Sequence, residues 1–218
     1  MFSRLFSAFK PAAPTVLLGP ATQPTTTTAL NAQQSIRTMA TNGSAGKEDF
    51  GTFALGCFWG SEHMYRKYYT GKGLLDAKVG YIGGKDSSKN PSYQEVCSGR
   101  TGHAEAVLVK FDPSQVTYAE LVEFFYRIHD PTTKDRQGAD RGTQYRSAIF
   151  PHNPEQVSVA KKVTEEVQEK HFTPSGKKIV TTIEERPVGA FFEGEDYHQR
   201  YLEMNPSGYE CPNHRLWW

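Results

Sequence analysis

Cysteine is scarce in this chain of 218 residues, which holds only Cys57, Cys97 and Cys211. An odd and sparse set of cysteines does not suit the disulfide framework of a small secreted domain. It suits a reducing compartment in which one or two thiols are chemically active. The chain also lacks any run of 18 apolar residues, so we expect no membrane-spanning helix.

An excess of charge of either sign is also missing, because the formal net charge is +1. No bulk attraction to nucleic acid or to a membrane surface follows from such a balance. Hydrophobic residues make up 37% and charged residues 22% of the chain, as in an ordinary globular protein. No repeat of 20–50 residues and no internal boundary is visible, so we expect one catalytic domain at 48–218, acting as a monomer.

Acidic residues are absent from the first 47 positions, and Glu48 is the first of them. The segment 1–47 is rich in Ser, Thr, Ala and Pro and carries scattered basic residues, the composition of an organellar transit peptide. We therefore expect a disordered presequence and a mitochondrial location, with an untargeted disordered tail as the alternative. Met39 lies just ahead of the domain, and initiation there would give a cytoplasmic form.

The body of the chain interleaves strand and helix patterns. Apolar alternation predicts strands at 51–56, 76–84, 103–112, 145–150 and 177–185. Helical spacing predicts helices at 57–70, 117–130 and 154–172 and a short one at 196–204. Thr117 and Glu120 form a capping-box pattern at the start of one helix. This order favours a ferredoxin-like two-layer α/β sandwich with a mixed sheet, long loops and a mobile coil tail at 204–218.

Cys57 occupies the junction between a predicted strand and a predicted helix. A thiol in the first turn of a helix meets unpaired backbone N–H groups and the positive end of the helix dipole, so we expect a reactive cysteine with a lowered pKa. The alternative is a buried structural cysteine. Gly56 and Gly60 would let another group approach the backbone closely. The neighbouring Phe58 and Trp59 either fill the core or form an apolar wall that holds a small group such as a methyl against the sulfur.

A carboxylate, Glu105, lies on the predicted strand at 103–112. Alternation places His103, Glu105 and Val107 on one face, and burial of the carboxylate beside Val107 would raise its pKa and suit it to act as an acid. The strand pattern alone favours the alternative, an ordinary surface glutamate. His103 is expected to be a hydrogen-bonded residue at the strand start. Cys97, flanked by apolar residues, is expected to pack as a small hydrophobe.

Two irregular stretches carry further candidates. The glycine-bounded loop at 138–150 holds Asp140 and Tyr145, and long polar loops in compact domains are often functional, although a solvated loop is the alternative. The stretch 205–218 holds Cys211, whose thiol could reach a distant partner on a flexible arm. Its C-x-x-H spacing with His214 lacks a second pair of ligands, so we expect no zinc site.

Five ordered blocks of this sequence resemble the A-type peptide methionine sulfoxide reductases. They are "GCFWG" (56–60), "GYIGG" (80–84), "PSYQEVCSGRTGHAEAV" (91–107), "HDPTTKDRQGADRGTQYRSAIF" (129–150) and "EDYHQRYL" (195–202). The resemblance covers about residues 51–211, and the tail "NPSGYECP" is similar to that of the fungal branch. It implies thiol-dependent reduction of methionine S-sulfoxide, free and in proteins, and repair of oxidative damage.

The resemblance also implies the roles of the Cys57 and Cys211 thiols and of the aromatic residues beside Cys57. Cys57 matches the catalytic nucleophile, and Phe58 and Trp59 match the aromatics that hold the S-methyl group. Cys211 matches a resolving cysteine that forms a disulfide with Cys57, for which thioredoxin is the external reductant. No metal or organic cofactor is implied. The chain ends in "PNHRLWW" with no fourth cysteine, so a second disulfide relay is not expected.

The resemblance implies further groups around the sulfoxide oxygen. Glu105 matches the acid that protonates this oxygen, and Tyr93 and Tyr145 match tyrosines that hydrogen-bond to it. Asp140 matches an acidic residue that lines the site.

Two other classes of function remain open on the residues alone. A thiol hydrolase or acyltransferase would pair Cys57 with a histidine, for which His103, His129 and His198 are available. Such an enzyme would have no use for a thiol in the tail. A binding module for oxidised or methionine-rich segments would use the aromatics but would need no nucleophile.

Overall fold

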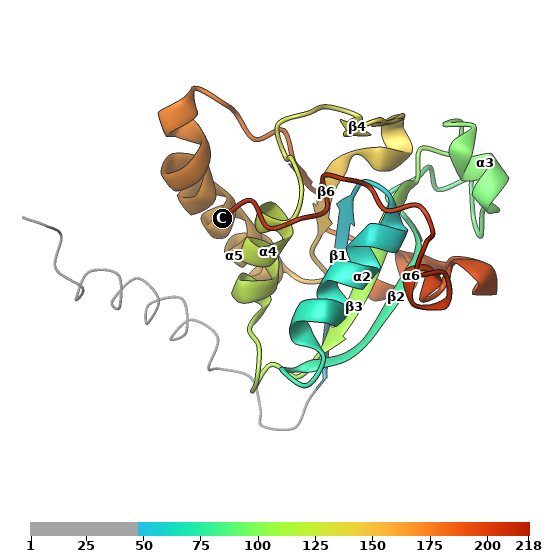
Figure 1. The fold of residues 1–218 in the computed structure, drawn as a ribbon, viewed down its shortest axis with the longest axis horizontal. Coiled ribbons are helices and arrows are strands. Elements are labelled where there is room, and N and C mark those ends of the chain that lie inside the picture. The colour runs from blue at the N-terminus through green and yellow to red at the C-terminus, as the bar shows by residue number, and fades with distance from the viewer. Residues whose placement is uncertain (1–47) are drawn as a thin grey trace, which may run out of the picture.

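The computed structural model describes residues 48–218, so the predicted presequence at 1–47 lies outside the described residues (Figure 1). A six-stranded sheet with the order β7-β6-β1-β3-β2-β8 forms the centre of the domain. Its strands are β1 (Asp49–Leu55), β2 (Leu74–Ile82), β3 (Ala104–Phe111), β6 (Ser147–Phe150), β7 (Thr182–Ile183) and β8 (Phe192–Glu193). Only β6 and β7 pair in parallel, so the sheet is mixed.

Three helices build the main core against one face of this sheet (Figure 1). They are α2 (Phe58–Tyr69), α4 (Tyr118–Arg127) and α5 (Pro154–Val167). Inward residues of β1 and β3, such as Phe53 and Val107, are fully buried beneath them. The order β1-α2-β2-β3-α4-β6 with the central strands arranged β6-β1-β3-β2 is the ferredoxin-like arrangement. The prediction of a ferredoxin-like α/β sandwich is confirmed.

Local signals explain where the helices begin. At the start of α4, the Thr117 hydroxyl accepts the Glu120 N–H at 3.2 Å while the Glu120 carboxylate accepts the Thr117 N–H at 2.8 Å, the predicted capping box. Asn153 caps α5 and Pro154 occupies its first turn, where a missing N–H costs nothing. The described residues contain no helix that is both long and apolar enough to span a bilayer.

The irregular regions differ most from expectation. The strand expected at 177–185 is reduced to β7, which makes only two register pairs at the sheet edge. The helix expected to reach residue 172 leaves α-geometry after Val167 and closes with a π-turn. The additional short elements are α3 (Tyr93–Cys97), β4 (Arg136–Gln137), β5 (Asp140–Arg141), α6 (Tyr201–Met204), η1 (Thr143–Tyr145), η2 (Gln168–Phe172), η3 (Thr173–Ser175), η4 (Val188–Ala190) and η5 (Asp196–His198).

The C-terminal tail, predicted as a mobile arm, is packed along the domain (Figure 1). Cys211 and His214 are buried within it. The Arg127 guanidinium donates to the carbonyl of Trp218 at 2.7 Å, and the Trp218 ring stacks on His171 with centroids 4.1 Å apart. The aromatic end of the chain therefore has a binding place between α4 and η2, which composition and the lack of periodicity did not reveal.

Candidate active site

Cys57 is the N-cap residue of α2, where the chain leaves β1. Its carbonyl accepts hydrogen bonds from the Ser61 N–H at 3.3 Å and the Ser61 hydroxyl at 3.1 Å, which fix the first turn. The backbone N–H groups of Trp59 and Gly60 point at the sulfur and favour the thiolate. The side chain is only 6% exposed. The predicted position of the thiol, at the amino end of a helix, is therefore what the structure shows.

The pKa of the Cys57 thiol nevertheless differs from the expectation. Burial raises it well above its ordinary value, and the charge of Glu105 raises it further. The helix N–H groups act in the predicted direction but are outweighed. The predicted lowering is therefore wrong for the reduced enzyme at rest, in which the thiol is protonated. Neutralising Glu105 removes one of the two main obstacles to ionisation.

Glu105 lies on β3 opposite Tyr81 of β2 and is 1% exposed. Its Oε2 accepts the Phe58 N–H at 3.1 Å, so the carboxyl faces the same helix start as the thiol. Burial raises its pKa from 4.5 to about 8, with a further rise from Asp140 and an opposing effect from the Phe58 N–H. The alternative of an ordinary surface glutamate is wrong. At neutral pH the group is mainly a neutral acid that can donate a proton.

An aromatic wall stands beside the thiol. Phe58 is buried, and the ring of His198 lies 4.9 Å from the Phe58 ring and 4.6 Å from the Tyr93 ring. Trp59 donates its indole N–H to Nδ1 of His198 at 3.0 Å and stacks on Tyr201 at 3.8 Å. This bond assigns the His198 proton to Nε2 and orients both rings. The sequence indicates His198 only as an available base, although this residue lies in the block at 195–202 that resembles the family.

Tyr93 and Tyr145 approach Glu105 from two different elements, α3 and η1. Both side chains are half-buried, and the Glu105 charge contributes to raising the pKa of each phenol after burial. The Tyr93 N–H is held by the Glu195 carboxylate at 2.9 Å, which also accepts the Tyr81 hydroxyl at 2.7 Å. Both phenols therefore stay protonated and can act as hydrogen-bond donors next to the buried acid.

Asp140 links the site to the tail. Its two carboxylate oxygens each accept the Tyr209 hydroxyl at 3.0 Å. Cys211 is fully buried, with its Sγ 3.8 Å from the Gln137 carbonyl, and the charge of Asp140 contributes to raising the pKa of both Cys211 and Cys57. The two thiols therefore share the surroundings of one carboxylate. Tyr209 was not predicted as a site residue, because nothing in an aperiodic tail marks it.

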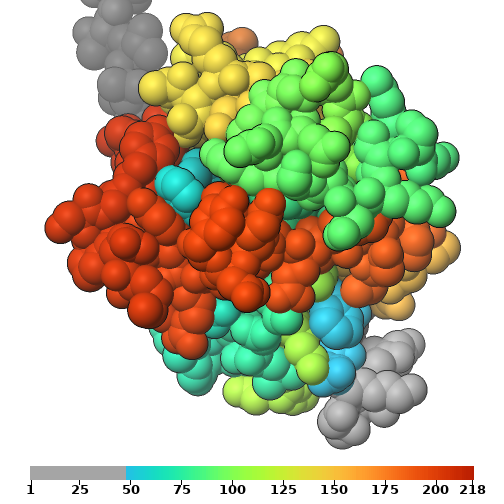
Figure 2. Space-filling view, turned by 90° about the vertical axis from the view of Figure 1, so that its right-hand side faces the viewer, coloured from blue at the N-terminus to red at the C-terminus, as the bar shows by residue number. Residues whose placement is uncertain are grey.

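Part of this region reaches the surface on one side of the molecule (Figure 2). Figure 2 shows a small patch coloured as the start of α2 between the tail, the 136–145 loop and the segment around α3. The tail therefore forms part of the rim of the site.

Cys97 differs from the expectation of a packed small hydrophobe. It is exposed, at the end of α3, and its thiol interacts with the Tyr93 hydroxyl. The apolar flanks that suggested burial belong to a short surface helix, in which only Val96 points inward.

The histidines do not form a base for the thiol. His129 bonds the Phe125 carbonyl at 2.7 Å and the Ser147 hydroxyl at 2.8 Å, and burial lowers its pKa to about 3. Nδ1 of His198 is occupied by Trp59. His103 is 3% exposed and packs against Phe192. The arrangement therefore gives no support to a cysteine–histidine hydrolase.

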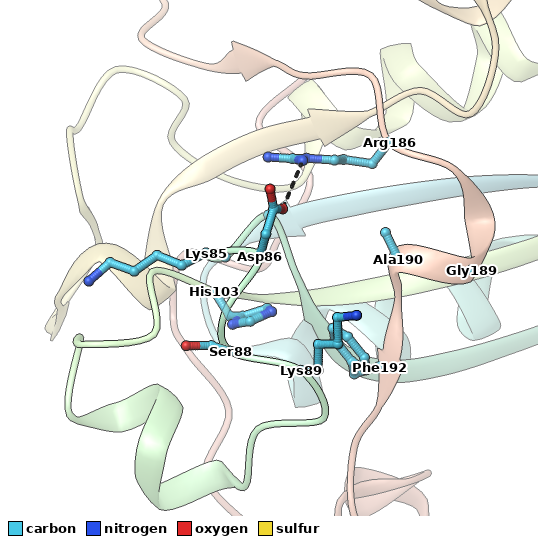
Figure 3. Close-up of a pocket in the computed structure, with 11 residues that line it drawn as sticks. Lys85, Asp86, Ser88, Lys89, His103, Arg186, Gly189, Ala190 and Phe192 are labelled. Atoms are coloured by element: carbon cyan, nitrogen blue, oxygen red, sulfur yellow. Dashed lines mark ion pairs between the residues drawn. The ribbon is translucent and has the colours of Figure 1, made fainter.

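His103 instead contributes to a separate cavity of about 450 Å³ (Figure 3). Lys85, Lys89 and Arg186 also line it, and Arg186 is paired with Asp86 at 4.0 Å. None of the predicted site residues lines this cavity. In the part of the chain that the structure describes, no group of three or more metal-ligating side chains is found.

A family model described as peptide methionine sulfoxide reductase matches residues 50–216. The chain belongs to this family. A probable peptide methionine sulfoxide reductase of Schizosaccharomyces pombe is 51% identical over 166 residues, which cover 76% of this chain and 94% of the relative. A mitochondrial peptide methionine sulfoxide reductase of Bos taurus is 47% identical over 157 residues, 72% of this chain and 64% of the relative. The predicted class, an oxidoreductase of this family, is confirmed.

Solved structures agree with this membership. Reduced Mxr1 of Saccharomyces cerevisiae has a TM-score of 0.72 at 47% identity, covering 79% of this chain and 94% of Mxr1. Mxr1 in complex with Trx2 has a TM-score of 0.51 at 35% identity, covering 79% of this chain and 92% of that one.

Proposed function

We propose that this chain reduces methionine S-sulfoxide, free and within proteins, to methionine, with Cys57 as the nucleophile. The observation that carries the proposal is the buried Glu105, whose pKa of about 8 makes it a neutral acid beside a thiol at a helix start. A sulfoxide sulfur becomes a good electrophile only when its oxygen gains a proton or strong hydrogen bonds. The site offers both kinds of group at once.

The first step transfers the sulfoxide oxygen to the enzyme. Glu105 donates its proton to the oxygen while the Cys57 sulfur, as it loses its own proton, attacks the sulfoxide sulfur. The oxygen passes to Cys57, the S–O bond of the substrate breaks, and methionine leaves with Cys57 as sulfenic acid. The phenols of Tyr93 and Tyr145 stabilise the oxygen during this transfer. The carboxylate left on Glu105 takes up the proton that the Cys57 thiol loses, so the acid returns to its neutral form and no proton is left over.

The aromatic wall gives the substrate its orientation. Phe58 and Trp59, with the His198 ring in contact with both Phe58 and Tyr93, form an apolar surface for the S-methyl group. Asp140, whose charge influences both Cys57 and Glu105, is the acidic residue that lines the site. Preference for the S epimer is carried over from the family resemblance.

The second step forms a disulfide. The Cys211 thiol attacks the sulfenic sulfur, an S–S bond replaces the S–O bond, and the hydroxyl leaves with the thiol proton as water. Thioredoxin then reduces the Cys57–Cys211 disulfide by thiol exchange. The solved complex of Mxr1 with Trx2 supports this choice of reductant. The cycle uses only thiols and protons, so no metal or organic cofactor takes part.

We further propose that the enzyme acts as a monomer in mitochondria, with a cytoplasmic form started at Met39. The acid-free composition of residues 1–47 and the mitochondrial relative in Bos taurus support this location.

The test is a single-turnover experiment on the fully reduced full-length protein. Methionine sulfoxide is added without any external reductant, and the methionine formed and the thiols lost are counted per enzyme. The expected result is about one methionine, two thiols lost and a disulfide mapped to Cys57 and Cys211. A folded sample that forms no methionine and keeps its three thiols would contradict the proposal and favour a binding module.

A further inference from the structure

His214 is the most deeply inserted side chain of the tail that carries no role in the proposed reaction. It is 4% exposed, and its Nε2 lies 2.8 Å from the carbonyl of Leu55. A carbonyl can only accept, so Nε2 carries the proton and donates it. Leu55 is the last residue of β1, two positions before Cys57. One hydrogen bond therefore ties the tail to the backbone that leads into the nucleophile.

The space for this ring exists because Gly60 has no side chain. A Cβ on Gly60 would lie 2.0 Å from Nδ1 of His214, closer than any real Cβ contact. A Cβ on Gly56 would lie 3.6 Å from Nε2 of the same ring and 2.6 Å from the Gln137 side chain. The close approach that the glycines of "GCFWG" were predicted to allow is therefore that of His214 and Gln137.

A short turn connects this ring to Cys211. The His214 N–H donates to the Cys211 carbonyl at 2.9 Å, and Asn213 between them donates to the Gln137 side chain at 2.7 Å. The Cys211 sulfur lies 3.8 Å from the Gln137 carbonyl and 3.5 Å from where a Cβ on Gly138 would be. Once the His214 ring is in place, the position of the Cys211 sulfur has little freedom left.

The other contacts of the tail are further from the nucleophile or more exposed. Tyr209 binds Asp140 but is 43% exposed. Trp218 binds Arg127 and His171, at the far end of the tail. His214 alone of these three touches the strand-to-helix junction that carries Cys57.

We infer that His214 is a positioning residue for the resolving thiol: by occupying the space over Gly60 and bonding Leu55, it keeps Cys211 beside the start of α2, ready to attack the sulfenic acid. The inference rests on the proposed function, because it assigns a role within the second step. A thiol held near its target reacts as if at high local concentration, whereas a thiol on a loose arm does not. His214 therefore affects disulfide formation and leaves the first step unchanged.

The test measures the two steps separately in the full-length protein. Methionine formation in one turnover reports the first step, and the loss of sulfenic acid, trapped with a 1,3-dicarbonyl reagent, reports the second. In H214A, the first methionine should appear at the wild-type rate, while disulfide formation slows on the order of tenfold or more and trapped sulfenic acid accumulates. H214Q, which keeps an N–H donor for Leu55, should recover part of the rate.

G60A tests the same contact from the other side. Its methyl group cannot coexist with the His214 ring, so G60A should also slow disulfide formation. The double variant G60A/H214A should be no slower than the slower single variant, because both changes break one contact. H152A is the matched control, since His152 bonds Thr52 on β1 at 2.9 Å and belongs to no part of the tail.

Three outcomes overturn the inference. They are disulfide formation at the wild-type rate in folded H214A, equal slowing of both steps, and additive effects of G60A and H214A. C211S separates this failure from a failure of the proposed function. If C211S turns over repeatedly with thioredoxin, the resolving role of Cys211 is wrong. If C211S stalls and H214A does not slow the second step, only the role of His214 is wrong.

Discussion

The two thiols of the proposed reaction are held by very different means. Cys57 is placed by regular structure, at the point where β1 ends and α2 begins, and its backbone position is fixed by the first helical turn. Cys211 lies in a segment without helix or strand and is placed by single side chains such as Asn213 and His214. A nucleophile can be fixed by its neighbours in sequence, whereas a thiol that must come from far along the chain needs tertiary contacts.

The largest effect is expected when the Cys57 thiol is removed. C57S should abolish methionine formation completely, because no other group can accept the sulfoxide oxygen at the helix start. The measurement is methionine released from the reduced protein in one turnover. Retained methionine formation in C57S would refute the assignment of the nucleophile, and C97S, which changes the exposed thiol, should behave as wild type.

Removal of the Cys211 thiol should leave the reduction of the first methionine sulfoxide intact and prevent further turnovers. C211S should form about one methionine per enzyme and then stall with thioredoxin, since the sulfenic acid has no internal partner. Methionine per enzyme against time measures this directly. Multiple turnover at the wild-type rate would assign resolution to Cys97 or to direct attack by the reductant.

The buried acid gives a pH test of the first step. Glu105 must be protonated to act, and its pKa of about 8 lies above 4.5, so the first-step rate in the wild type should fall as the pH rises through about 8. E105Q should slow this step by about 10²–10⁴ and lose that limb of the pH profile. Substrate binding should change little. If the pH profile of E105Q were the same as that of the wild type, a group other than Glu105 would be the proton donor.

The smallest effect is expected at the exposed contact of the tail. Y209F removes the hydroxyl that bonds Asp140 but keeps the ring. Because Tyr209 is 43% exposed, water can replace the lost bond, and disulfide formation should slow by less than about tenfold. Y197F, at another exposed tyrosine, is the control. An effect of Y209F larger than that of H214A would reverse the ranking of the two tail contacts.

The positions of several helices and strands could be predicted because they depend on residues that are close together in the sequence. The capping box at Thr117 and Glu120 needs only four consecutive residues, and the apolar alternation at 103–112 correctly predicted the strand that carries Glu105. The helix start at Cys57 also follows from nearby glycines and apolar residues. In each case the physical cause lies within a few positions of the residue concerned.

The pKa of Cys57 and the contact at Gly60 could not be predicted, because both depend on segments that are distant in the sequence and pack against these residues. The pKa of Cys57 was predicted in the wrong direction because its burial and the nearness of Glu105 are set by tertiary contacts. Gly60 indicated that some group approaches the backbone, but only the structure identifies it as His214. Gly60 lies in a helix and His214 lies 154 positions later in an aperiodic tail, so no sequence pattern connects these two residues.

The exposure of the three thiols has a consequence for survival of the enzyme under oxidative stress. The pKa values of all three thiols are raised, but Cys57 and Cys211 are buried, whereas Cys97 is exposed. Peroxides and alkylating agents attack thiolates that they can reach. An oxidant that meets the resting protein therefore encounters first the one cysteine that the reaction does not need, and slow chemical labelling of Cys57 in that state is the mark of a guarded nucleophile.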